Sequence, residues 1–227
     1  MDSLQTNLIE IRRRIERAAQ SAGRDPCDIR LIAVSKAASV DAIQTLIAAG
    51  HCDFGENRLP AGLKKLQAVE AEVRWHMIGR IQTNKIKYLP QFSLIHSLDR
   101  WPLAVALNEY ALKKDLRFRC LVQVNIARDP NKAGILPGEL PDFITSLSEL
   151  NNLEIQGLMT IPALEADSQQ TRSWYANLAN QFAETGAGKL PGNVKMRWLS
   201  MGMSDDFELA VAAGANMVRV GSAIFSN

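Results

Sequence analysis

Short runs of apolar residues alternate with amphipathic segments along almost the whole chain. Residues 31–36 read Leu-Ile-Ala-Val-Ser-Lys, an apolar run that has no helical period and ends in a lysine. Such a run is typical of a strand that is buried on both faces, as in a parallel sheet. Residues 118–126 show the same property most clearly. Further strands are predicted at the start of residues 52–58 and at residues 73–78, 92–96, 153–159, 196–200 and 217–220.

Helical patterns separate these strands. In residues 3–22 the apolar side chains recur every three or four residues, and Gly23 ends the segment. Other helices are predicted at residues 40–49, 61–72, 83–89, 100–114, 139–150, 168–184 and 205–213. Strands that alternate with helices require right-handed parallel crossovers, and eight such units close a barrel. The pattern therefore predicts an α/β (β/α)8 TIM barrel with an extra N-terminal helix.

An open, doubly wound sheet is the alternative architecture. That fold carries a Gly-x-Gly-x-x-Gly sequence after its first strand, and this chain has none. The chain also has no linker rich in proline, glycine or serine. We therefore expect one barrel domain over residues 1–227.

Composition narrows the range of partners. The 227 residues are 47% hydrophobic and 22% charged, as in ordinary soluble proteins. A net charge of +2 gives no indication of a nucleic-acid partner. The arginines at 12–14 and 17 form the nearest thing to a basic patch, and Glu10 and Glu16 on the same predicted helix balance them. No apolar stretch approaches the roughly 18 residues of a membrane span, and no apolar leader begins the chain. A cytoplasmic protein without a membrane partner is expected.

The three cysteines do not indicate a metal site. Cys27, Cys52 and Cys120 are isolated and lack metal-ligand spacing. We therefore predict no metal in this protein.

Candidate chemistry begins with Lys36 at the carboxyl end of the first strand. In α/β folds, ligands bind at that end of the sheet. Burial favours the neutral form of an amine, and a neutral amine can attack an aldehyde. We expect Lys36 to be such an amine; the alternative is a lysine that extends from the strand end into solvent.

The last two strands end in small residues. One runs into Ser200-Met201-Gly202-Met203-Ser204, and the other runs into Gly221-Ser222. Glycines allow a close backbone approach to an oxyanion, which hydroxyl groups and backbone amides then bind. Many barrels hold phosphate at these two loops, although turn glycines with helix-capping serines would give the same pattern in either loop alone.

Arg219 lies inside the short apolar strand at residues 217–220. A charged group in such a place is usually paired. Arg219 points either inward to an anion or acceptor, or outward to a helix carboxylate. An amine, a phosphate cradle and an inward arginine would together suit a phosphorylated aldehyde held as a Schiff base, a description that pyridoxal 5′-phosphate (PLP) fits.

Ordered sequence blocks over residues 31–225 support this interpretation. The chain resembles the pyridoxal phosphate homeostasis protein family in the blocks Val34-Ser35-Lys36, Phe54-Gly55-Glu56-Asn57-Arg58, Trp75-His76-Met77-Ile78-Gly79, Gln82-Thr83-Asn84-Lys85, Ile95-His96-Ser97, Gln123-Val124-Asn125, Gly157-Leu158-Met159-Thr160, Leu199-Ser200-Met201-Gly202-Met203-Ser204 and Val218-Arg219-Val220-Gly221. The resemblance implies the barrel domain of alanine racemase, fold type III, without its second domain.

The resemblance also implies roles for individual residues. Lys36 would be the Schiff-base lysine, and Arg219 would face the ring nitrogen or the phosphate. The cofactor ring would be lined by Asn57 and His76, with Met159 and Ser204 nearby. The phosphate would be held by Ser200, Gly202, Gly221 and Ser222. Many relatives have Thr-Lys-Pro after the Schiff-base lysine, whereas this chain has Ala37-Ala38-Ser39, so a role for a second lysine there is lost.

Lys132, in the loop after the fifth strand, matches a lysine that many members of the family carry. It would assist cofactor transfer, or be an ordinary solvent-exposed loop residue.

Three functional hypotheses follow from the sequence. In the first, the protein binds PLP without catalysis and delivers it to apoenzymes. The second is a small racemase-like enzyme that uses Lys36 and His76, and the third is a barrel without ligand. The first is favoured because an arginine at the ring nitrogen stays charged, leaves the nitrogen unprotonated and weakens the ring as an electron sink. The chain also lacks the racemase domain that supplies the opposing base and a dimer surface, so a monomer is expected.

Overall fold

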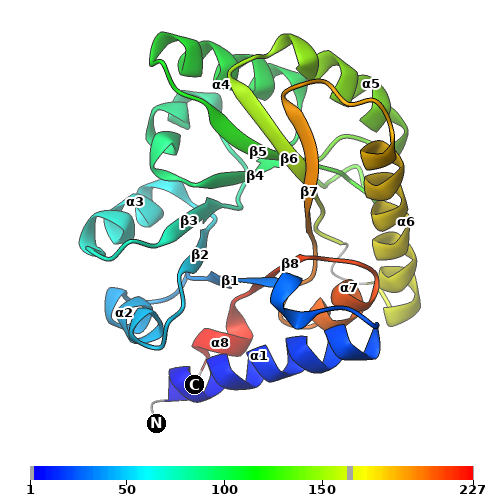
Figure 1. Ribbon diagram of the computed structural model, residues 1–227. Coiled ribbons are helices and arrows are strands. Elements are labelled where there is room, and N and C mark those ends of the chain that lie inside the picture. Colours follow the sequence, from blue (N-terminus) through cyan, green and yellow to red (C-terminus); the bar gives the residue numbers. More distant parts are fainter. Residues whose placement is uncertain (1–2, 163–165, 227) are drawn as a thin grey trace.

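A closed barrel of parallel strands forms the centre of the computed structural model, which describes residues 3–162 and 166–226 (Figure 1). Each strand pairs with the next in chain order, and β8 pairs with β1. The strands are β1 (Arg30–Val34), β2 (Asp53–Glu56), β3 (Arg74–Met77), β4 (Leu94–Leu98), β5 (Phe118–Gln123), β6 (Leu153–Met159), β7 (Val194–Ser200) and β8 (Met217–Val220). The predicted (β/α)8 architecture is confirmed.

Helices surround the barrel, and the predicted N-terminal helix α1 packs against α7 and α8. The α-helices are α1 (Ser3–Ser21), α2 (Val40–Ala48), α3 (Leu59–Ala68), α4 (Trp101–Lys113), α5 (Leu140–Ser146), α6 (Ser168–Ala187), α7 (Phe207–Ala212) and α8 (Ser222–Phe225). The 3-10 helices are η1 (Pro26–Asp28), η2 (Thr83–Gln91), η3 (Pro137–Glu139) and η4 (Leu147–Glu149). Among the described residues, no helix combines the length and the apolar character that a membrane crossing requires.

Several elements differ from the sequence prediction by a few residues, and two of the differences have clear local reasons. The helix α8 was not predicted, because four residues are too few to show a helical period. The strand β7 begins at Val194, earlier than the predicted residue 196, because its first half alternates buried and exposed positions instead of forming an apolar run.

The barrel interior is partly apolar and partly polar. Its apolar part is a cluster of buried side chains from β1, β4, β5, β6 and β8: Ile32, Leu94, Leu121, Met159 and Met217. The larger apolar core lies between the strands and the helices. Side chains of a strand alternate between the two layers, so polar residues at inward positions are enclosed by the barrel. His76, His96, Ser200 and Arg219 are buried in this way.

Candidate functional site

The carboxyl ends of β1 and β2 are joined by buried polar contacts. The Ser35 hydroxyl donates to Glu56 Oε1 at 2.6 Å, and Lys65 Nζ of α3 lies 2.9 Å from the same oxygen. Lys65 Nζ also donates to the backbone oxygen of Ser35. The helix approaches closely because residue 62 is glycine, where a Cβ atom would lie 3.1 Å from Glu56 Cβ. Lys65 and Glu56 thus form a nearly buried ion pair beside the loop that carries Lys36.

Sequence reasoning missed this ion pair. Lys65 lies in a helix with an ordinary alternation of charged and apolar residues, and Glu56 is the last residue of a short strand. Nothing local shows that the two meet. The other carboxylate oxygen, Glu56 Oε2, is buried and has no hydrogen-bond partner among the described residues.

Replacing Lys65 with methionine is expected to lower the free energy of unfolding by about 3–5 kcal/mol, because it leaves the buried Glu56 carboxylate without a cation. Adding Glu56→Gln in the Lys65→Met background should recover most of the loss. Urea denaturation measures both changes. The matched control is Lys64→Met, which removes an exposed lysine from the same helix. Equal losses for the two lysines would contradict the role of the ion pair.

Lys36 itself is exposed, so the expectation that it is buried is wrong. The strand β1 ends at Val34, and the backbone turns after it, with the Ala38 amide donating to the Ser35 oxygen at 2.9 Å. Lys36 therefore lies past the carboxyl end of β1, and its side chain is open to solvent. The structure therefore agrees with the alternative interpretation, an exposed lysine at the end of the strand.

The loops after β7 and β8 contact each other at the same end of the barrel. Ser204 Oγ accepts hydrogen bonds from the backbone amides of Gly221 at 3.2 Å and Ala223 at 3.4 Å. Gly202 has φ 92°, and a Cβ atom there would lie 2.6 Å from Ala210 Cβ. The glycine therefore permits both the turn and the close packing of α7. Gly221 lies against β1, since a Cβ atom on it would be 3.3 Å from Val34 Cβ.

Asp206 ties the β7 loop to α6. Its Oδ1 accepts from the Met203 amide at 2.6 Å, and its Oδ2 accepts from the Tyr175 hydroxyl at 2.9 Å. Burial, reinforced by the neighbouring Asp206 carboxylate, raises the pKa of Tyr175 far above its ordinary value. Tyr175 lies in α6, and its contact with this loop is a second feature that the sequence did not reveal.

Arg219 points inward, the first of the two predicted directions. Its side chain is enclosed, and it donates to Ser200 Oγ at 2.7 Å and to the Thr160 backbone oxygen at 2.8 Å. Burial lowers the pKa of Arg219. Within the part of the chain that the structure describes, it forms no ion pair with a carboxylate. The guanidinium is therefore a buried cation whose direct partners are neutral oxygens.

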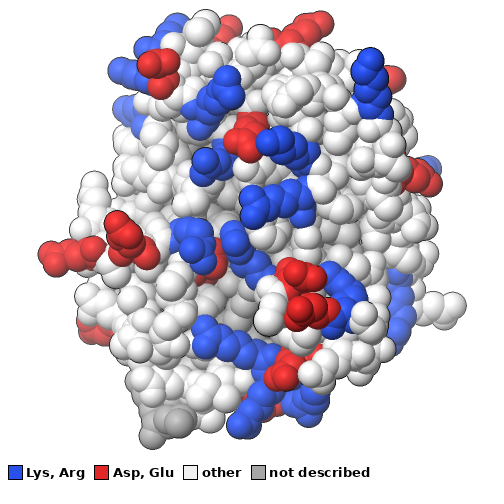
Figure 2. Space-filling model, in the orientation of Figure 1, with Lys and Arg blue, Asp and Glu red and all other residues white. Residues whose placement is uncertain are grey.

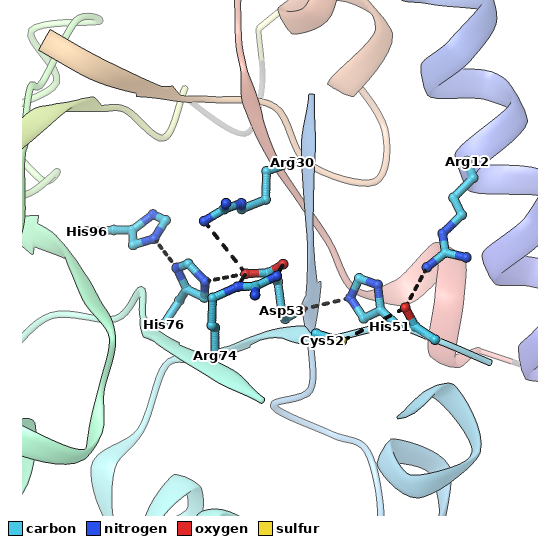
Figure 3. Close-up of polar contacts among 9 residues, drawn as sticks. Arg12, Arg30, His51, Cys52, Asp53, Arg74, His76 and His96 are labelled. Carbon is cyan, nitrogen blue, oxygen red and sulfur yellow. Dashed lines mark hydrogen bonds and ion pairs between the residues drawn. The ribbon is translucent and has the colours of Figure 1, made fainter. Parts of the chain in front are cut away.

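A chain of hydrogen bonds crosses the barrel from Ser200 to the start of β2. His96 Nδ1 lies 3.0 Å from Ser200 Oγ, and His96 Nε2 lies 3.0 Å from His76 Nδ1. His76 Nε2 in turn lies 3.1 Å from Asp53 Oδ1 (Figure 3). Arg74 also donates to both Asp53 oxygens, at 2.7 and 2.6 Å.

The direction of donation along this chain follows from its two ends. Asp53 as a carboxylate only accepts, so the His76 Nε2–H donates to it, and the His96 Nε2–H donates to His76 Nδ1. Ser200 accepts from Arg219 and donates its own proton to His96 Nδ1. Burial lowers the pKa of both histidines, well below the ordinary value for His96. Both rings are therefore neutral, and every nitrogen of the pair is occupied.

Asp53 anchors the chain as an anion. Burial by itself would raise the pKa of Asp53, but the hydrogen bonds from Arg74 and His76 lower it well below the ordinary value. His51 also bonds the Asp53 backbone oxygen, at 2.8 Å (Figure 3).

The predicted cofactor residues thus have different surroundings. Ser200 and Arg219 contact each other, and Ser204 contacts Gly221. Ser222 is exposed at the first turn of α8, and Asn57 is half-buried after β2. By contrast, Met159 packs in the apolar barrel interior and His76 bonds Asp53 and His96. The cofactor roles given to these residues stay predictions.

Comparison with known proteins identifies similar chains. The family described as "Alanine racemase, N-terminal domain" matches residues 6–227. The pyridoxal phosphate homeostasis protein of Pseudomonas aeruginosa is 36% identical over 227 residues, which is 99% of this chain and 96% of the relative. The solved structure of PipY from Synechococcus elongatus with PLP bound has a TM-score of 0.78 and 32% identity, covering 94% of this chain and 100% of PipY. Alanine racemase from Corynebacterium glutamicum has a TM-score of 0.71 at 18% identity, covering 100% of this chain and 61% of the racemase, a likeness in fold alone.

Proposed function

This chain belongs to the pyridoxal phosphate homeostasis protein family, and on that premise we propose that it binds PLP without catalysis. In this proposal Lys36 holds the PLP aldehyde as a Schiff base. The protein stores the cofactor and releases it to apoenzymes in the cytoplasm, as part of vitamin B6 homeostasis. The solved structure of PipY with PLP bound supports the ligand class.

The observation that most supports PLP is the buried guanidinium of Arg219. A buried charge normally has a charged or strongly accepting partner, and the described residues offer Arg219 only the Ser200 hydroxyl and a backbone carbonyl. A ligand with an unprotonated ring nitrogen or a phosphate would complete its hydrogen bonding. Two backbone amides, those of Gly221 and Ala223, now donate to the Ser204 hydroxyl oxygen. In the bound state they would donate to a phosphate oxygen in its place. The residues present therefore fit the cofactor.

When bound, PLP would supply an electrophilic aldehyde and a conjugated ring. The residues of the chain would grip it at both ends. The exposed Lys36 amine is open to an incoming aldehyde, and Ser200, Gly202, Ser204, Gly221 and Ser222 would hold the phosphate. Asn57, His76 and Met159 would lie toward the ring.

We propose the absence of catalysis because the side chains that could act as a base already have hydrogen-bond partners. Each ring nitrogen of His76 and His96 already has a partner, and the Tyr175 hydroxyl is bonded to Asp206. Removing a proton from bound substrate would break one of these buried bonds. An arginine at the ring nitrogen also weakens the electron sink that a racemase needs.

The proposal predicts that PLP becomes fixed to Lys36 alone. Protein incubated with PLP should show visible absorbance, and borohydride reduction followed by peptide mapping should locate the label on Lys36. The Lys36→Ala variant should lose essentially all fixed cofactor, because the proposal places the Lys36 amine at the aldehyde, and the neighbouring Lys65 amine is held by Glu56 and the Ser35 oxygen. Lys132→Ala, which alters the loop after β5, is the matched control and should keep it.

Two results would contradict this assignment. One is a label on Lys65 or Lys132 that persists at full stoichiometry in Lys36→Ala. The other is exchange of an amino-acid Cα proton in heavy water, followed by NMR, which would support the racemase-like enzyme instead. The monomeric state is part of the same proposal, and light scattering that shows a stable dimer would refute it.

A further inference from the structure

The amino ends of the strands surround a hollow that lies apart from the proposed phosphate cradle, although His76 lines it as well. Figures 1 and 2 look onto this end of the barrel, and Lys and Arg side chains gather around its centre. The hollow has a volume of about 340 Å³. Its basic lining residues each come from the first part of a different strand: Arg30, Arg74, Arg119 and Arg197.

The arginines outnumber the carboxylates that they contact. Arg74 and Arg30 share Asp53, at 2.6 and 3.9 Å, and Arg119 lies 3.5 Å from Glu154. Arg197 forms no ion pair with any residue in the described ranges. Four guanidinium groups against two carboxylates leave two positive charges at the hollow.

An indole ring holds two of these cations in place. The guanidinium carbon of Arg30 lies 4.4 Å from the ring centroid of Trp198, and that of Arg197 lies 4.8 Å from it. Stacking on an aromatic face orients a guanidinium but uses few of its N–H donors. The two groups are therefore positioned and incompletely bonded, and the positive charge of Arg197 acts on Arg30. That arrangement suits a ligand with several anionic oxygens, which paired N–H groups of arginine bind well.

The small size of the hollow and its two surplus positive charges define the class of ligand. A macromolecular polyanion would contact a broad surface, whereas this site is a hollow enclosed by strand ends. We propose that the hollow binds one small phosphate dianion, either inorganic phosphate or the phosphate group of a monoester. Arg197 and Arg30 are the principal donors, and Arg119 supports them from β5.

The proposal does not depend on PLP. The hollow lies at the amino ends of the strands, whereas the proposed phosphate cradle lies at their carboxyl ends. Asp53 links the hollow to that end, because it begins the hydrogen-bond chain through His76 and His96 to Ser200. A ligand of Arg74 or Arg30 would therefore lie next to the first member of this chain.

Titration with inorganic phosphate in dilute chloride buffer tests the site, with tryptophan fluorescence and calorimetry as the readouts. Phosphate should give a saturable change in fluorescence, because it draws Arg30 and Arg197 away from the Trp198 ring. Arg197→Gln should raise the Kd at least about tenfold, the effect of losing one charged donor pair. Added salt should weaken binding. Glycerol 3-phosphate, used in parallel, distinguishes a monoester ligand from free phosphate.

The matched control is Lys195→Gln, which removes one positive charge from the same strand outside the hollow. It should change the Kd much less than Arg197→Gln. Arg119→Gln is a second variant of the lining and should also weaken binding. Equal effects of Arg197→Gln and Lys195→Gln would overturn the proposal. Phosphate binding that is weakened by Ser204→Ala but by none of the arginine variants would also overturn it, because the phosphate would then be bound at the other end of the barrel. Absence of a saturable calorimetric signal in the unaltered protein would overturn it as well.

Discussion

Lowering the pH from 7 to 5 is expected to reduce the free energy of unfolding of the ligand-free protein by at least about 2 kcal/mol. All three histidines of the chain, His51, His76 and His96, are buried. Burial lowers the pKa of each, to about 4 for His51. In the unfolded chain each ring titrates near the ordinary value of about 6.5, so acid protonates the unfolded state first.

The sign of this effect follows from the direction of the pKa shifts. A base with a lowered folded pKa contributes stability that is full above its unfolded pKa and falls as the pH drops below it. For His51, whose folded pKa is about 4, the loss between pH 7 and 5 is about 2 kcal/mol, and His76 and His96 add to it in the same direction. Asp53 acts in a different range. Its folded pKa is lowered, so its contribution is full above the unfolded pKa of about 3.9 and is lost only in stronger acid. The histidines therefore govern the interval from pH 7 to 5.

Urea denaturation at pH 7, 6 and 5 measures this dependence. His51→Gln is the informative variant, because an amide can keep the hydrogen bond that His51 Nε2 makes with the Asp53 backbone oxygen. That variant should retain the fold, and its pH-dependent change should be smaller by about 2 kcal/mol, the contribution of the His51 proton. A free energy of unfolding that is constant from pH 7 to 5 would contradict the neutral, buried state of the histidines.

The substitution Gly157→Ala is expected to lower the free energy of unfolding by more than about 4 kcal/mol. Gly157 lies in β6, where the register with β7 shifts between Ile155 and Gly157. Its φ is 141°, a conformation that side chains rarely adopt, and a Cβ atom would lie 1.9 Å from the Trp198 backbone oxygen. Because the obstacle is backbone, β6 and β7 would have to separate to make room.

Gly138→Ala is the matched control for this prediction. Gly138 is exposed in η3, and a Cβ atom there would meet nothing within 4 Å. Its replacement should leave stability unchanged or slightly raised, because alanine restricts the unfolded chain more than glycine does. Urea denaturation compares the two variants, and circular dichroism monitors the fold where Gly157→Ala accumulates poorly. Similar stabilities would contradict the assigned role of Gly157.

The local pattern of the chain was sufficient to predict the barrel. Each buried strand is an apolar run of a few residues, and each intervening helix shows its own period, so the alternation is visible without any long-range information. The inward direction of Arg219 was one of two possibilities that its apolar neighbours allowed. The small residues after the last two strands marked the loops that now meet through Ser204 and Gly221.

The contacts that define the site depended on closure of the barrel. His96 and Ser200 are 104 positions apart and are bonded only because β4 and β7 face each other across the interior. Lys65 reaches Glu56 because α3 packs against β2, and Tyr175 reaches Asp206 because α6 packs against the β7 loop. Lys36 was expected to be buried, but whether a strand ends one residue earlier or later is set by pairing with its neighbours. A sequence determines which residues favour strands, helices and turns, whereas distances between distant side chains follow only from the tertiary register of the strands.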